Sequence, residues 1–190
     1  MKIRKTIFLI MAALLAAAML FSVCSCGVTG KGGSGGNSGG SGSDGSEDGG
    51  GVTVTVGGET FKLDYETDHG ALHYSENIPI MDRGTMGSVR DIYGRSDEGT
   101  LFVLRMVYFK DKGIEEVMEG SDNELSQKTM NGIAYTYFEY DDPEMPASKA
   151  HTFMYVFDGT TYSISFVSEY DLSSLEEGFF KTVYFEGTID

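Results

Sequence analysis

The alternation of apolar and polar residues predicts that most of the chain after residue 51 folds as β-strands. Residues 52–56 and 59–65 alternate on either side of Gly57-Gly58. Two glycines between alternating runs are typical of a β-hairpin turn. Residues 100–109 are apolar at nearly every position, which predicts a central strand covered on both faces.

The C-terminal half gives the clearer strand pattern. Asn131-Gly132 and Asp158-Gly159 are dipeptides typical of tight turns, and each stands next to an aromatic, alternating run. Further strands are predicted at 133–140, 151–157, 161–167 and 184–188. The segment 68–99 has a weak pattern, and only one strand is predicted in it, at 88–93.

Two helices are predicted from apolar residues at helical spacing. Ile114, Val117 and Met118 recur at i, i+3 and i+4 and face away from three glutamates, which indicates a short amphipathic helix. A second helix is predicted at 173–183, where Ser173 and Glu176 match a capping box and Asp171 is an alternative cap.

The predicted order is strands, helix, strands, helix. Strands joined by hairpins form antiparallel sheets, so this order predicts an α+β domain. We expect a mostly antiparallel sheet of about five to seven strands, packed with two or more helices.

The same order of elements resembles the PsbP-like family. The resemblance lies in the opening hairpin that ends in Phe61-Lys-Leu-Asp-Tyr65, the Asn131-Gly-Ile-Ala-Tyr135 turn, the Asp158-Gly159 hairpin and the closing helix at 175–183. It implies an antiparallel sheet sandwiched by helices over most of residues 52–190. Family members often carry a Trp after the opening hairpin, and this chain has no Trp.

The first 25 residues have the pattern of a secretory signal peptide. Lys2, Arg4 and Lys5 precede an uncharged apolar run at residues 7–21. The run ends in Val23-Cys24-Ser25-Cys26-Gly27, which resembles the lipobox of bacterial lipoproteins. By this resemblance Cys26 is the lipidated first residue of the mature protein, and Cys24 leaves with the leader. The alternative is an uncleaved membrane anchor, because about 18 apolar residues can just span a bilayer.

The composition divides the chain into three parts: the signal peptide at 1–25, a linker at 26–51 and one globular domain at 52–190. Residues 27–51 hold 13 Gly and 5 Ser in 25 positions, so a flexible, disordered coil is predicted there. The two cysteines lie in the leader region and none follows residue 26. Disulfides, thiolate metal sites and cysteine nucleophiles are therefore excluded from the domain.

The domain at 52–190 is strongly acidic. It holds 10 Lys and Arg against 26 Asp and Glu, a net charge of −16. Such a surface repels anionic headgroups and nucleic acid, so nucleic acid is not an expected partner and the membrane is expected to be contacted through the lipid anchor alone.

The candidates for chemistry are few. His69 and His73 have the spacing of a zinc-binding helix, but their neighbours disfavour a helix and no H-E-x-x-H motif is present. The carboxylates at 141–144 and 122–124 lack the spacing of a calcium loop. A carboxylate pair for glycoside hydrolysis stays open, because it depends on separation in space. We predict no cofactor, no metal and no catalytic residue.

Aromatic residues are the one unusual feature of the strands. Tyr135, Tyr137, Phe138 and Tyr140 occupy both faces of one strand, and two helices are too few to cover both faces of the sheet. A partly exposed tyrosine face could bind a glycan, a peptide or a protein. The alternative is that these rings form the core.

These observations predict a non-enzymatic, lipid-anchored protein on the extracytoplasmic face of a bacterial cell membrane. Its role would be to contact an envelope protein or a wall polymer. A solute-capturing lipoprotein serving a transporter is the alternative, and a hydrolase is a third reading.

The lipidation prediction can be checked on the protein isolated from its own membranes. Mass spectrometry of the N-terminal peptide is expected to find Cys26 as the first residue and to find it acylated, because two or three acyl chains are needed for stable anchoring. An unmodified residue 26 would contradict the assigned location.

Overall fold

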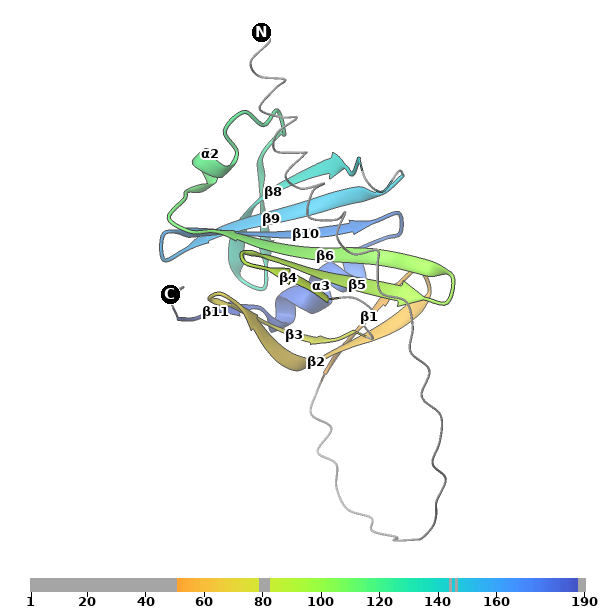
Figure 1. The fold of residues 1–190 in the computed structure, drawn as a ribbon. Helices are drawn as coiled ribbons and strands as arrows, with labels where there is room; N and C mark the ends of the chain where they lie inside the picture. The colour runs from red at the N-terminus through yellow and green to blue at the C-terminus, as the bar shows by residue number, and fades with distance from the viewer. Residues whose placement is uncertain (1–50, 79–82, 144, 146, 188–190) are drawn as a thin grey trace, which may run out of the picture. The chain divides into compact units, whose positions relative to one another are not determined.

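The computed structural model describes residues 51–78, 83–143, 145 and 147–187. The predicted signal peptide, Cys26 and all of the predicted linker except Gly51 lie outside these residues. The described residues belong to one compact unit, Glu47–Asp190, and form two antiparallel sheets with one helix between them (Figure 1).

The smaller sheet has four strands in the order β1-β2-β3-β11. Its strands are β1 (Val52–Val56), β2 (Glu59–His69), β3 (Leu72–Asn77) and β11 (Tyr184–Phe185). The predicted turn at Gly57-Gly58 is confirmed, since both glycines adopt positive φ and β1 pairs with β2 in antiparallel register. Val54, Val56, Phe61 and Leu63 are buried on the inner face.

The larger sheet has seven strands in the order β4-β5-β6-β10-β9-β8-β7. Its strands are β4 (Arg83–Met86), β5 (Val89–Ser96), β6 (Gly99–Phe109), β7 (Ser126–Met130), β8 (Ile133–Asp141), β9 (Lys149–Phe157) and β10 (Thr160–Ser168). The predicted hairpin turns at Asn131-Gly132 and Asp158-Gly159 are confirmed by positive φ at all four residues. β6 lies inside the sheet, between β5 and β10, as its apolar sequence predicts; its inner face is buried at Phe102, Leu104 and Met106, whereas Arg105 and Val107 on the other face are of intermediate exposure.

The predicted α+β class, and the helix-covered sandwich that the family resemblance implied, are wrong. The described part is mostly strand, and its helices are α2 (Ile114–Val117) and α3 (Ser173–Thr182). Three strands were missed: β3, β4 and β7. β3 and β7 each place a charged side chain on the inner face, Glu76 and Lys128, which breaks the apolar alternation on which the prediction depended.

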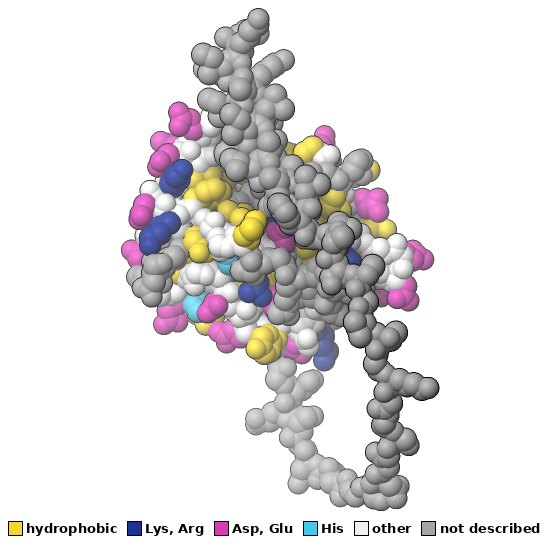
Figure 2. All heavy atoms as spheres, viewed as in Figure 1, with side chains coloured by type: hydrophobic (Ala, Val, Ile, Leu, Met, Phe, Trp, Pro, Cys, Tyr) yellow, Lys and Arg dark blue, Asp and Glu magenta, His cyan; other side chains and the backbone are white. Residues whose placement is uncertain are grey.

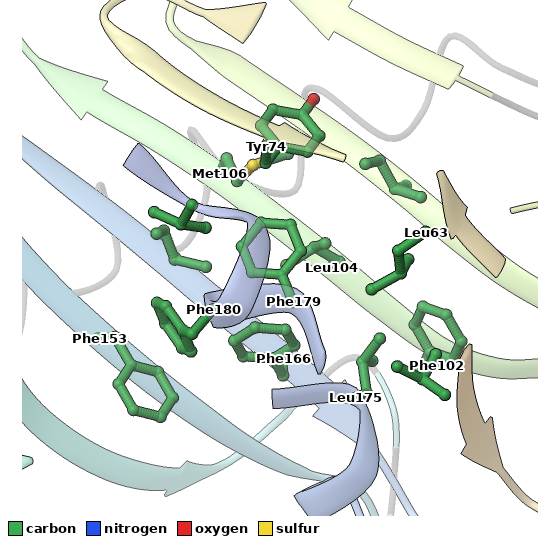
Figure 3. Packing of buried hydrophobic residues seen from close by; sticks show 14 of the residues in the cluster. Leu63, Tyr74, Phe102, Leu104, Met106, Phe153, Phe166, Leu175, Phe179 and Phe180 are labelled. Carbon is green, nitrogen blue, oxygen red and sulfur yellow. The ribbon is translucent and has the colours of Figure 1, made fainter. Parts of the chain in front are cut away.

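Helix α3 lies between the two sheets and supplies the centre of the core. The Phe179 ring packs against Tyr74 of the smaller sheet, and the Phe180 ring packs against Phe153 of the larger one (Figure 3). Phe180 also packs against Tyr135 of the larger sheet. Both phenylalanines also contact Phe166 of β10. Full burial of one large apolar side chain contributes about 1.5–3 kcal/mol, so these rings carry much of the attachment between the sheets.

The start of α3 differs from its predicted cap. Leu172 is the N-cap residue and makes no side-chain cap. Asp171 instead accepts hydrogen bonds from the backbone N–H and the hydroxyl of Ser173. The predicted capping box is wrong, because the Glu176 side chain turns away from the helix start to partners on the larger sheet.

A second, smaller apolar cluster lies on the other face of the seven-stranded sheet. Val103, Ala150 and Val167 come from three neighbouring strands and are buried there, with Tyr93 and Tyr140 packed beside them. No helix among the described residues is both long enough and apolar enough to span a membrane.

Close packing of α3 against β1 gives a testable prediction at Gly178. A Cβ at this position would lie 2.2 Å from Cγ1 of Val54, a buried and branched side chain. We expect Gly178→Ala to lower the free energy of unfolding by about 1–2 kcal/mol, because overpacking outweighs the gain of about 1 kcal/mol in helix propensity.

The measurement is urea unfolding, with Gly113→Ala as the control. A Cβ at Gly113 meets nothing within 4 Å, so this variant is expected to change stability by about 0.5 kcal/mol or less. A more stable Gly178→Ala variant would show that α3 does not approach β1 this closely.

Candidate functional site

Most of the aromatic residues that could have formed an exposed face belong to the core. Tyr135, Phe153, Tyr162 and Phe166 are all buried. Tyr135, Phe153 and Phe166 pack against the phenylalanines of α3, and Tyr162 packs against Phe185 of β11. The interpretation of these rings as core is therefore confirmed for the central part of the sheet.

The rings at one end of the sheet are only half-buried. Phe185 of β11 packs with Tyr155 at 4.8 Å and with Phe157 at 5.6 Å between ring centroids. All three residues are of intermediate exposure and pack against the main core. Tyr155, Phe157 and Phe185 are called the aromatic strip below. Tyr155 and Phe157 lie on β9 and Phe185 lies on β11, so the strip depends on the way β11 returns after α3.

A small pocket adjoins the aromatic strip. It has a volume of about 100 Å³, and Phe157 contributes to its wall. Its other lining residues include Ala71, Lys110, Asp111, Asp158 and Tyr162. A water molecule occupies about 30 Å³ of liquid, whereas pockets for small-molecule ligands usually exceed about 300 Å³. The pocket is therefore large enough for the end of one side chain.

The polar groups of the pocket come from turns and from one buried tyrosine. Asp111 and Asp158 adopt positive φ, of 56° and 46°, and both are exposed. The Tyr162 hydroxyl accepts a hydrogen bond of 2.8 Å from the backbone N–H of Ala71. Burial raises the pKa of Tyr162, so its hydroxyl is neutral at physiological pH. The charged groups on the lining are thus two carboxylates and the Lys110 ammonium.

A second polar site lies at the start of α3, around the buried carboxylate of Glu176. Its Oε2 atom is 3.1 Å from Nζ of Lys128 on β7, and its Oε1 atom is 2.5 Å from Nδ1 of His151 on β9. The Glu176 side chain is 5% exposed, against 39% for Lys128 and 25% for His151. A buried carboxylate is costly without such partners, so the three residues hold the helix to the sheet.

Tyr137 and Glu139 extend this charged cluster along β8. The Tyr137 hydroxyl donates a hydrogen bond to the Glu139 carboxylate, and Lys128 Nζ lies 4.6 Å from the centroid of the Tyr137 ring. Burial and the bond to Glu139 raise the pKa of Tyr137, and the same bond lowers the pKa of Glu139. The cluster therefore keeps the neutral phenol of Tyr137 beside the ionised carboxylate of Glu139.

The carboxylate–imidazole pair resembles part of a catalytic triad, but its surroundings favour a structural role. A general base needs a nucleophile within hydrogen-bond reach. Among the described residues, no hydroxyl is hydrogen-bonded to His151. The contacts of Glu176 instead join α3 to β7 and β9.

The other two histidines point to opposite faces of the smaller sheet. His69 is buried on the inner face, where Nε2 bonds to the Ser88 carbonyl oxygen at 3.1 Å, and burial lowers its pKa. His73 lies on the outer face with its ring stacked on Tyr184. The structure therefore does not bring the two imidazoles together as metal ligands.

The candidate carboxylate loops make local contacts. An Asp142 carboxylate oxygen accepts a hydrogen bond from the backbone N–H of Met145, and Asp122 lies exposed in the loop before β7. Within residues 51–78, 83–143, 145 and 147–187, no three His, Cys, Asp or Glu side chains are grouped to hold a metal ion. Glu144 and Cys26 fall outside the described residues.

Sequence reasoning missed both the pocket and the charged cluster around Glu176. Glu176 was read as a capping residue, and Lys128 lies in a polar segment that gave no strand pattern. The pocket is built from residues read only as turns, Asp158 above all. The one signal for it was the acidic residue at the first position of the Asp158-Gly159 turn, next to an aromatic residue on the strand.

The comparisons with known proteins give little information about function. No protein-family model matches the sequence, and no curated protein matches it. A crystal structure of a protein from Bacteroides thetaiotaomicron VPI-5482 is similar over 62% of this chain, with 14% sequence identity and a TM-score of 0.46. The chain spans about half the length of that protein, 46% of it. Similarity at this level supports no assignment of function.

The ion pair between Lys128 and Glu176 can be tested by a double-mutant cycle. We expect Lys128→Met to lower the free energy of unfolding by about 1–3 kcal/mol, because it removes one of the two partners of a buried carboxylate. Adding Glu176→Met is expected to restore much of the loss, since the buried charge is then gone.

Lys149→Met is the matched control, because Lys149 is exposed at the start of β9 in the same sheet. It is expected to change stability by about 0.5 kcal/mol or less. Additive effects in the cycle, measured by urea unfolding at pH 7, would contradict a direct interaction between Lys128 and Glu176.

Proposed function

We propose that this chain is a non-enzymatic interaction module that is held by a lipid on Cys26 at the extracytoplasmic face of a bacterial membrane. In this role the folded domain contacts another component of the envelope. The observation that carries the proposal is the aromatic strip beside the small pocket. Half-buried rings next to a concavity of side-chain size are typical of surfaces that receive a protein or polymer chain.

The location in this proposal is supported by the sequence alone. A basic and apolar leader ends at a lipobox-like Cys26, and a Gly- and Ser-rich linker separates that residue from the domain. Such a linker has an r.m.s. span of about 25–30 Å, which would hold the domain near the membrane and allow it to reach partners.

The size of the pocket favours an interaction module over solute capture. A solute-binding lipoprotein encloses its ligand, which requires a volume of about 300 Å³ or more. The pocket has about one third of that volume, so a whole solute molecule would remain mostly outside it. A side chain or one unit of a polymer fits the dimensions better.

The charge of the domain favours a basic partner. Arg90, Arg105 and Lys128, three of its ten basic residues, pair internally with Glu76, Asp91 and Glu176. This leaves 7 basic and 23 acidic residues outside those pairs, so the net charge of −16 lies on the other side chains. Figure 2 shows acidic side chains around the rim of the face in view. Such a field increases the rate of association with a cationic partner.

The proposal can be tested by photo-crosslinking the full lipidated chain in cells that produce it. A benzophenone amino acid at Tyr155, within the aromatic strip, is expected to give a crosslinked product of discrete mass. The reason is that a partner seated on the strip lies within a few Å of the probe. Mass spectrometry of the product identifies the partner.

Val156 is the matched control position. It follows Tyr155 on β9 and is 41% exposed, and successive strand residues point to opposite faces. A probe at Val156 is expected to give no such product. Equal products from both positions, or none from either, would refute the strip as a contact surface.

A further inference from the structure

We propose that the pocket binds a lysine or arginine side chain from an extended segment of an envelope protein, while the aromatic strip receives an apolar residue of the same segment. This inference rests on the proposed function and specifies the chemistry of the partner.

The charges on the pocket favour a cation. Asp111 and Asp158 contribute two carboxylates, and Lys110 contributes one ammonium group, so the lining carries a net charge of −1. Both aspartates are exposed and lie in turns at the rim, where an incoming ammonium or guanidinium group can reach them without burial of an unpaired charge. The net charge of the whole domain, −16, has the same sign as the net charge of the pocket lining.

The half-buried ring of Phe157 favours a cation on an aliphatic stem. Phe157 lines the pocket, and the face of an aromatic ring attracts a cation within about 6 Å of its centroid. The methylene groups of a lysine or arginine side chain can pack against the same ring. A volume of about 100 Å³ accommodates the end of such a side chain but excludes a large ring.

The position of the pocket relative to the strip defines the rest of the segment. Phe157 belongs to both, and Phe185 contacts Phe157 and Tyr162 together. A basic side chain in the pocket therefore places neighbouring residues of its own chain over Phe185 and Tyr155. In an extended peptide the residues at i and i+2 face the same side, whereas those at i and i+1 face opposite sides. A basic residue followed directly by an apolar residue therefore matches this surface poorly. A segment with a basic residue at i and an apolar residue at i+2 matches it best.

The probe is the peptide Gly-Lys-Gly-Phe-Gly-amide with fluorescein attached to its N-terminal amine, so that the lysine side chain stays free; it is titrated against the full-length protein in detergent micelles and followed by fluorescence anisotropy. The peptide with Glu in place of Lys is the control ligand. We expect saturable binding of the lysine peptide, weakened by salt, and binding of the glutamate peptide at least about tenfold weaker.

The protein variant that tests the site is Asp111→Asn/Asp158→Asn. Asparagine tolerates the left-handed backbone at both positions, so the turns are preserved while two charges are removed. This variant is expected to bind the lysine peptide about tenfold more weakly. Asp97→Asn/Glu98→Gln makes the same change in net charge at an exposed turn elsewhere and is expected to bind like the unaltered protein.

Equal weakening in the two variants would assign the binding to net charge and overturn the site. Absence of lysine-peptide binding, or equal binding of both peptides, would also overturn it. Because crosslinking at Tyr155 does not depend on the charge of the partner, a crosslinked product without peptide binding would leave the interaction module standing and remove only the basic anchor.

Discussion

The insertion of α3 between the two sheets is the packing constraint on which the rest of the domain depends. Phe179 and Phe180 are consecutive, so their rings project in different directions from the helix, one toward Tyr74 of the smaller sheet and the other toward Phe153 of the larger. Neither sheet contacts a second helix of this length in the described part of the chain. The apolar inner faces of β1, β2 and β3 are thus buried through α3 and through the larger sheet.

Placing a helix inside a sandwich has an electrostatic consequence. Five of the ten residues of the helix are buried, and one of these, Glu176 in its first turn, is directed at the larger sheet. Lys128 and His151 offset the cost of burying this carboxylate, as Arg90 does for the buried Glu76 of β3. Lys128 has a second effect, because an inward-pointing charge on an edge strand disfavours pairing of that edge with another chain.

The candidate binding surface follows from the same arrangement. The chain leaves α3 at Val183 and, within the described residues, adds the two-residue strand of Tyr184 and Phe185 to the edge of the smaller sheet. That short strand covers the end of β9 incompletely, so Tyr155 and Phe157 stay half-buried and the pocket remains beside them.

The sequence by itself determined the hairpins, the central strand β6 and the closing helix, because glycine-containing turns and apolar periodicity are local signals. It also carries the whole case for lipidation at Cys26. It did not reveal β3 or β7, since the inward Glu76 and Lys128 become compatible with a core only beside Arg90 and Glu176, which are distant in the chain. Nor did it reveal the pocket, whose walls come from four separate segments. Tertiary structure decided these features, because the cost of burying a charge depends on partners that only folding brings together.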